Sequence, residues 1–172
     1  MIKLTIRRAM LLRFVAISSA ALFIFACQTM TGSYRVGQVI PAEKRIPLAH
    51  DGIQEGQWDT NNLNIKYRYQ QTGNSLTIKG KVAFSKSLKM GFTTLDRFYL
   101  NMVLIDESGR ILASQPLLTI AYRSHLNILS FKRDITLPPK TAAITFTFRG
   151  RVGDAGDGAD DSIHWYFSKA PY

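Results

Sequence analysis

The sequence predicts an all-β fold, a two-layer antiparallel β-sandwich of immunoglobulin-like type with about seven strands. Apolar and polar residues alternate with a period of two in most segments after residue 58. Turn-forming residues separate these segments at short intervals, and no segment has the pattern of a convincing amphipathic helix. A small β-barrel is the alternative architecture. An antibody-type domain is excluded, because the chain has one cysteine and no Cys-Trp-Cys pattern.

The first two expected strands, residues 62–70 and 76–85, alternate regularly in apolar and polar side chains. The segment 71–74 (QTGN) lies between them and has the composition of a turn. We therefore expect an antiparallel hairpin with one face in the core and the other in water.

Residues 98–105 are apolar at both parities, which fits either a central strand covered on both faces or a short helix. The segment 106–109 (DESG) has turn composition and leads into another apolar segment, so a strand in a hairpin is favoured. Pro116 is expected to break or bulge the returning strand, which is tolerated at a sheet edge. The alternation resumes at residues 118–122.

Three further strands are expected at residues 129–137, 144–148 and 163–167. Pro138 ends the first of them, and a loop rich in Gly and Asp, residues 150–161, separates the last two. The side chains expected to point inward are enough for one core. They are Tyr67, Ile78, Phe84, Leu100, Leu104, Phe131, Phe146 and Trp165.

The composition narrows the class of protein. The chain has 172 residues, 46% of them apolar, and a formal net charge of +10. The apolar content excludes a disordered chain, and the length fits one domain. A single cysteine excludes an internal disulfide framework and a zinc site built from clustered cysteines.

The N-terminal 26 residues predict a secretory signal peptide. They carry four basic residues and no acidic one, and the 13 residues from Phe14 to Ala26 are uncharged. As a helix this run would rise about 20 Å, which is short of the roughly 30 Å hydrocarbon core of a bilayer. A basic segment, a short apolar segment and a final small residue are typical of a signal peptide. An uncleaved anchor and a buried core helix are the alternatives.

The one cysteine directly follows this apolar run, in the sequence LFIFACQ. The segment resembles the lipobox of bacterial lipoproteins, with Ile24 at −3, Ala26 at −1 and Cys27 at +1, although Phe25 is bulkier than the usual residue at −2. The resemblance implies that cleavage separates Ala26 from Cys27, that the thiol carries diacylglycerol, and that the new amino terminus is often acylated. Several acyl chains hold a protein stably on a membrane, whereas one does not. Gln28, rather than Asp, at +2 implies the outer membrane in a Gram-negative cell.

The expected organisation has three parts: a signal peptide at residues 1–26, a lipidated tether at 27–57 and the β-sandwich at 58–172. Glycines and prolines interrupt every possible helix between residues 28 and 57. The later half of this tether, at Ile46-Pro47-Leu48, is a candidate edge strand, and a disordered linker is the alternative.

The Asp-rich loop is the sharpest cluster of chemistry-bearing side chains. Its carboxylates could supply oxygen ligands to Ca²⁺, but the spacing lacks the order of an EF-hand. We expect a solvated loop and no cofactor, with Ca²⁺ as the open alternative. The candidate ligands are Asp154, Asp157, Asp160 and Asp161.

No motif predicts an enzyme. His50, His125 and His164 are isolated in the sequence, and none has the spacing of a zinc motif. The chain contains no nucleophile elbow, no phosphate-binding P-loop and no dinucleotide-binding fingerprint. We expect a non-catalytic protein.

Four basic residues, Lys66, Arg68, Lys79 and Lys81, occupy the polar parity of the first hairpin and should share its wet face. Such a face suits an anionic envelope glycan or lipid, whereas nucleic acid is not expected for an exported protein. A solvated face that guards against aggregation is the bland alternative. We expect a lipid-anchored envelope protein that serves scaffolding or protein binding, with the anionic glycan or lipid as the alternative partner.

Overall fold

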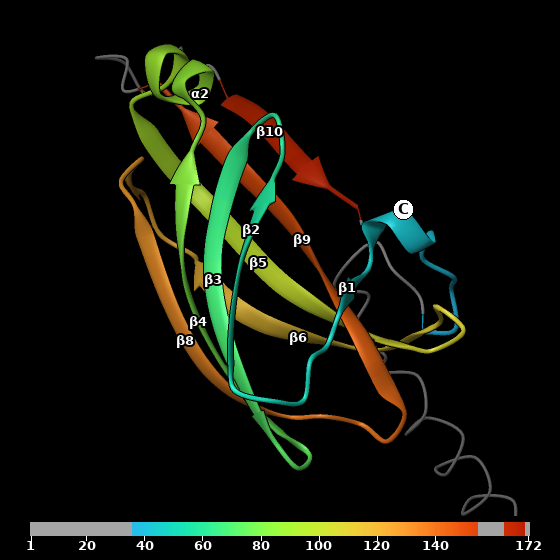
Figure 1. The fold of residues 1–172 in the computed structure, drawn as a ribbon. Coiled ribbons are helices and arrows are strands. Elements are labelled where there is room, and N and C mark those ends of the chain that lie inside the picture. The colour runs from blue at the N-terminus through green and yellow to red at the C-terminus, as the bar shows by residue number, and fades with distance from the viewer. Residues whose placement is uncertain (1–35, 155–163, 171–172) are drawn as a thin grey trace, which may run out of the picture. The chain divides into compact units, whose positions relative to one another are not determined.

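The computed structural model describes residues 36–154 and 164–170, and the predicted all-β sandwich is confirmed for them. Two antiparallel sheets form the two layers (Figure 1). One sheet has four strands in the order β2 (Ile53–Asp59), β3 (Leu63–Thr72), β4 (Ser75–Phe84) and β8 (Leu129–Thr136). The other has six strands, with the order β1 (Ile46–Pro47), β9 (Thr141–Gly153), β5 (Thr94–Asp106) and β6 (Ile111–Ile120), to which β7 (Ser124–His125) adds on β5 and β10 (His164–Lys169) adds on β9.

Aromatic side chains join the two layers. The ring of Tyr67 in β3 lies 5.0 Å from that of Phe146 in β9, and Phe84 in β4 meets Phe98 in β5 edge to face at 5.4 Å. Such tilted and edge-to-face pairs stabilise a core beyond the area that they bury. Phe167 of β10 stacks on Phe98 at 6.2 Å and extends this cluster to the edge of the six-stranded sheet.

Seven of the eight residues expected in the core are buried, and Trp165 is the exception. It is 56% exposed, whereas Phe167, two residues later on the same strand, is 4% exposed. The inward prediction for Trp165 is wrong because β10 is an edge strand that pairs only with β9. Period-two alternation assigns a side chain to a face of a strand, but it does not show where the opposite sheet ends.

The predicted first hairpin is confirmed as β3 and β4, which pair from Leu63 opposite Phe84 to Thr72 opposite Ser75. Gly73 in its two-residue turn has φ of 59°, a conformation that glycine adopts readily.

The run at residues 98–105 belongs to the central strand β5, as the hairpin context indicated. Both of its faces are buried. Its inner side chains join the main core, while Val103 and Ile105 on the outer face form a second apolar cluster with Ile40, Ile111 and Ala143. Pro116 lies in edge strand β6 beside a shift in register, as predicted.

The predicted tether is wrong for the residues from Val36 onward. Ile40 is fully buried on the outer face of β5, and its backbone N–H donates to the carbonyl of Gly109 at 2.8 Å. The candidate edge strand at Ile46-Pro47 is confirmed as β1, and β2 then pairs with β3 over seven residues. Strand β2 escaped prediction because Trp58 is the only large apolar residue on its inner face, so the alternation is weak.

One short α-helix, α2 (Lys86–Gly91), was not expected. The side chain of Ser85 caps it by accepting from the N–H of Leu88 at 3.3 Å, and Leu88 is buried. Six residues are too few for helical periodicity to appear in the sequence. A 3₁₀ turn, η1 (Ala42–Lys44), precedes β1. Across the described ranges, none of the helices is long and apolar enough to span a bilayer.

Candidate functional site: a basic groove across the four-stranded sheet

One row of residues crosses the four-stranded sheet and points its side chains into the core. The row runs from Gly56 through Tyr67 and Gly80 to Phe131, each directly opposite the next. The aromatic rings of this row lie against its glycines, because a Cβ on Gly80 would be 2.6 Å from Cζ of Phe131. The outer side of this row is therefore backbone, and it forms the floor of a groove.

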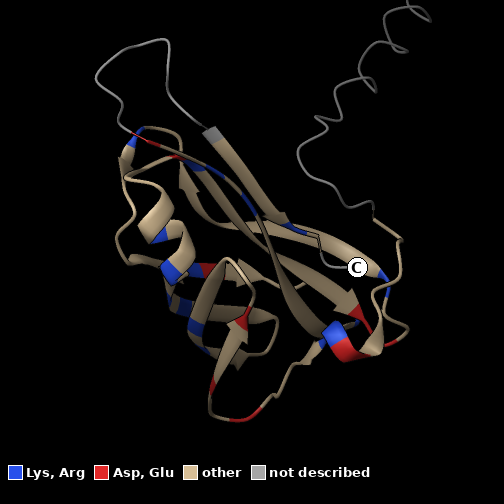
Figure 2. Cartoon of the chain, turned by 90° about the horizontal axis from the view of Figure 1, so that it is seen from above, with Lys and Arg blue, Asp and Glu red and all other residues tan. Residues whose placement is uncertain are grey.

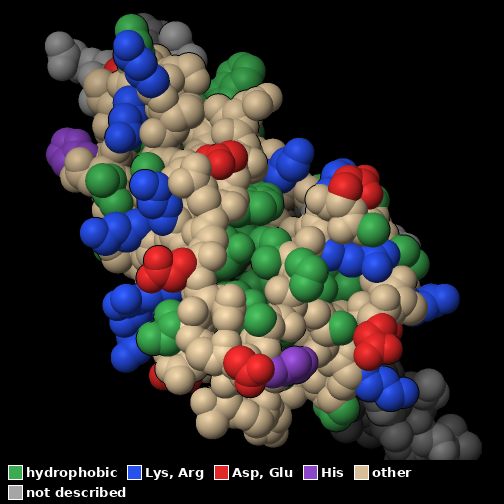
Figure 3. Space-filling model, viewed as in Figure 1, with side chains coloured by type: hydrophobic (Ala, Val, Ile, Leu, Met, Phe, Trp, Pro, Cys, Tyr) green, Lys and Arg blue, Asp and Glu red, His purple; other side chains and the backbone are tan. Residues whose placement is uncertain are grey.

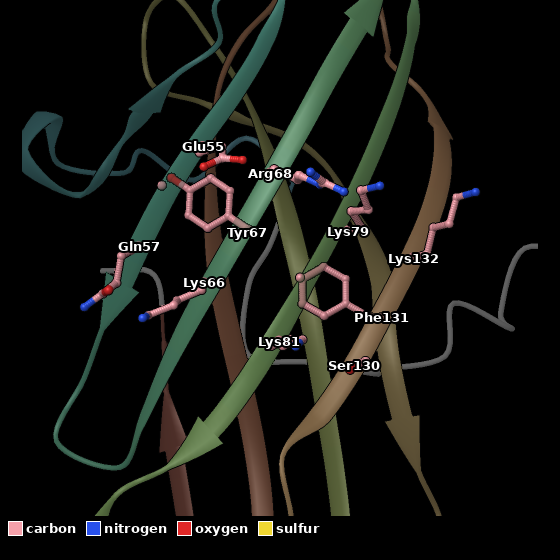
Figure 4. Close-up of a pocket in the computed structure, with 12 residues that line it drawn as sticks. Glu55, Gln57, Lys66, Tyr67, Arg68, Lys79, Lys81, Ser130, Phe131 and Lys132 are labelled. Atoms are coloured by element: carbon pink, nitrogen blue, oxygen red, sulfur yellow. The ribbon is translucent and has the colours of Figure 1, made fainter.

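The rows on either side of this floor point outward and form the walls. One wall runs across the strands as Glu55, Arg68, Lys79 and Lys132, and the other as Gln57, Lys66, Lys81 and Ser130. Together with the floor they enclose an open cavity of about 780 Å³, which we call the basic groove (Figure 4). Strands lie about 4.8 Å apart, so each wall presents a side chain roughly every 5 Å along the groove.

The four basic residues predicted to share the wet face of the hairpin all line this groove, and all are exposed. The structure adds a fifth cation, Lys132 of β8. Sequence reasoning missed it because the pairing of β8 with β4 joins segments about 50 residues apart, which no local pattern shows. Figure 2 marks Lys and Arg positions on the strands beneath α2, and Figure 3 shows basic side chains gathered on the side where β4 and β8 lie.

The cations of the groove face one another across the strands. Arg68 is directly opposite Lys79, Lys79 is opposite Lys132, and Lys66 is opposite Lys81. Like charges in directly opposite positions destabilise a sheet. Among the residues that the structure describes, no carboxylate lies within 4.0 Å of any of these five cations. With one carboxylate, Glu55, the groove keeps a local net charge of +4.

A carboxylate at the end of β2 is held in its ionised form. The pKa of Asp59 lies below its usual range, chiefly because the side-chain amides of Gln57 and Asn64 donate hydrogen bonds to it. The charge of Lys66 adds a smaller lowering. The floor residue Tyr67 behaves in the opposite way, since burial raises its pKa and keeps the hydroxyl neutral.

The other candidate residues do not meet in a site within the described ranges. Asp154 is exposed and accepts a hydrogen bond from Oγ1 of Thr93 at 3.1 Å. His50 and His125 are exposed, and the described part of the chain holds no group of three side chains suited to a metal ion. The side chain of His164 and five other predicted residues lie outside the described residues. These five are Ala26, Cys27, Asp157, Asp160 and Asp161.

Comparison with known proteins finds no protein family that matches the chain and no curated protein that matches it significantly. The argument for function therefore depends on the chemistry of the groove.

Proposed function

We propose that this chain is a lipid-anchored protein of the bacterial cell envelope that binds a linear anionic polymer, such as an acidic glycan, along the basic groove. The observation that carries the proposal is the pair of cationic walls on either side of a side-chain-free floor. The lipid anchor rests on the lipobox-like sequence that ends at Cys27. No part of the proposal requires catalysis.

The shape of the site favours a chain over a flat surface. A polymer that lies across the strands meets cations on both sides, about 5 Å apart along each wall and about 7 Å apart across the floor. A flat lipid surface would reach only the tips of the walls. The unpaired, like-charged arrangement lowers the stability of the sheet, and a polyanion would relieve this repulsion.

Binding of another envelope protein is the second candidate function. The edge strand β10 favours it, because Trp165 and Tyr166 are 56% and 73% exposed there. Exposed aromatic side chains are enriched where proteins bind one another. In this case, a partner retained by the full chain would be lost from the Trp165→Lys variant and kept by the groove variants described next.

The groove is tested by titrating the full chain, purified in detergent, with alginate, a linear carboxylated glycan, and with neutral dextran. Lys79→Gln combined with Lys81→Gln should weaken alginate binding by about 2–30-fold, since each exposed ion pair contributes about 0.2–1 kcal/mol. The matched control is Lys86→Gln with Lys89→Gln in α2, which removes the same charge outside the groove. Binding should also weaken as salt rises from 0.1 M to 1 M, because the Debye length falls from about 10 Å to about 3 Å.

Equal weakening by the groove pair and the control pair would mean that net charge alone drives binding, and the proposed site would be wrong. Binding of dextran as tight as that of alginate would contradict the electrostatic account.

The lipid anchor has a separate test. The Cys27→Ala variant should lose the mass of the acyl chains and keep or shed its leader differently from the wild type. If the variant has the mass expected from an unchanged modification and fractionates with membranes as the wild type does, the anchor is refuted.

A further inference from the structure

A second cavity lies on the outer face of the six-stranded sheet, over β5, β9 and β10. It measures about 330 Å³, and we call it the arginine pocket. Its lining residues occupy the outward parity of their strands, opposite to the buried rings of Phe98 and Phe167. They are Arg97, Tyr99, Arg149, Gly150, Arg151 and Tyr166.

The pocket repeats the construction of the basic groove on the other layer. Phe98, Gly150 and Phe167 lie directly opposite one another, and their side chains belong to the core. The ring of Phe167 occupies the space that a Cβ on Gly150 would need. The floor is therefore backbone, and the neighbouring rows supply the arginine and tyrosine walls.

Two of the three guanidinium groups are held in place. The Cζ atom of Arg149 lies 4.6 Å from the centroid of the Tyr99 ring, a cation–π contact. The Nε atom of Arg151 lies 3.2 Å from Oδ2 of Asp96, a carboxylate that is 7% exposed. The pKa of Arg151 lies above its ordinary value, chiefly because the side chain of Tyr166 hydrogen-bonds to it, and Asp96 adds to the effect.

The charge of the pocket is not balanced within the described part of the chain. Arg97 lies directly opposite Arg151, an arrangement that destabilises a sheet unless something compensates for it. No carboxylate in the described ranges lies within 4.0 Å of Arg97 or Arg149. Three arginines and the buried Asp96 leave a local net charge of +2.

We propose that the arginine pocket binds the phosphate group of a phosphate ester. The planar fork of a guanidinium matches phosphate oxygens with two parallel hydrogen bonds, and several such forks suit a group with three terminal oxygens. A phosphate monoester carries a charge of about −1.5 to −2 near pH 7, which complements the pocket. A carboxylate has two oxygens and one charge, so it would leave part of the cluster unsatisfied. The tyrosine rings offer apolar faces to the organic part of the ester.

The test is calorimetric titration of the full chain in detergent with glucose 6-phosphate, inorganic phosphate and glucose, and with micelles that contain phosphatidic acid. Arg97→Gln removes one guanidinium that has no ion pair in the described structure, so the fold should persist, which the melting temperature checks. We expect the variant to bind the phosphate compounds at least about tenfold more weakly than the wild type. The matched control, Arg133→Gln, changes an exposed arginine of β8 that lies outside the pocket and should bind within about twofold of the wild type.

Tighter binding of glucose 6-phosphate would identify a sugar phosphate as the source of the group, and tighter binding of phosphatidic acid would identify a lipid headgroup; either result supports the pocket. The proposal is overturned if none of the phosphate compounds binds at concentrations up to about 10 mM. It is also overturned if Arg97→Gln binds as the wild type does, or if Arg133→Gln weakens binding equally. None of these results depends on alginate binding, so this proposal and the basic groove can fail separately.

Discussion

Replacing Gly80 with alanine should destabilise the four-stranded sheet, because the ring of Phe131 occupies the place of the missing side chain. A Cβ at this position would lie 2.6 Å from Cζ of Phe131 and 2.6 Å from the carbonyl oxygen of Lys66. Favourable contacts between carbon atoms lie near 3.5–4.0 Å. The ring can move, whereas the carbonyl belongs to the β3 backbone. Overpacking of this kind costs about 1–3 kcal/mol, which at roughly 4 °C per kcal/mol lowers Tm by about 4–12 °C.

Thermal unfolding of the full chain, followed by circular dichroism, measures this effect. The matched control is Gly91→Ala, since no heavy atom lies within 4 Å of the Cβ that it adds at the end of α2. This control should leave the free energy of unfolding unchanged or raise it by up to about 1 kcal/mol, through the lower entropy of the unfolded chain.

A second substitution shows whether the ring is the cause. Phe131→Leu removes the ring atoms nearest the new methyl group, so the double variant with Gly80→Ala should lose less stability than the sum of the two single variants. A Gly80→Ala protein as stable as the Gly91→Ala control would refute the reasoning. So would additive effects in the double variant, because they would mean that the methyl group and the ring do not meet.

Three further predictions concern the segment before β1 and the carboxylates. Ile40→Ala should cost about 2–4 kcal/mol in urea unfolding because Ile40 is fully buried, whereas Val36→Ala, at a residue 75% exposed, should stay within about 0.5 kcal/mol; equal effects would return the segment to a tether. Asp96→Ala should cost about 1–3 kcal/mol in the same assay, since it leaves Arg151 without its carboxylate, and an unchanged protein would contradict the ion pair. The pKa of Asp106 is lowered, first by a serine hydroxyl and then by backbone N–H donors of its turn. Its ionised form therefore contributes stability that is present above about pH 4 and is lost as the pH falls through the lowered pKa. The unfolding curves of Asp106→Asn and wild type should thus differ at pH 7 and converge in acid, and a constant gap would exclude this role.

The sequence was sufficient for the elements whose side chains alternate strongly. The hairpin of β3 and β4, the central strand β5 and the bulge beside Pro116 follow from local patterns and from the composition of their turns. Local pattern failed where burial comes from a distant segment. Nothing in the residues around Ile40 shows that β5 needs a cover on its outer face, because that need arises only when Val103 and Ile105 turn away from the main core.

The same distinction applies to the candidate sites. The parity of the hairpin was enough to place Lys66, Arg68, Lys79 and Lys81 on one face. Lys132 required the pairing of β4 with β8, which depends on tertiary structure. The arginine pocket could not be predicted at all, since three strands that are far apart in the sequence contribute its walls.

The basic groove is tested most directly by acetylation footprinting of the full chain, with and without alginate, read by mass spectrometry at each lysine. The account predicts that alginate protects Lys66, Lys79, Lys81 and Lys132 together, while Lys89 in α2 reacts as before. Protection spread equally over all five lysines, or confined to Lys89, would contradict the claim that the anionic polymer lies along the groove.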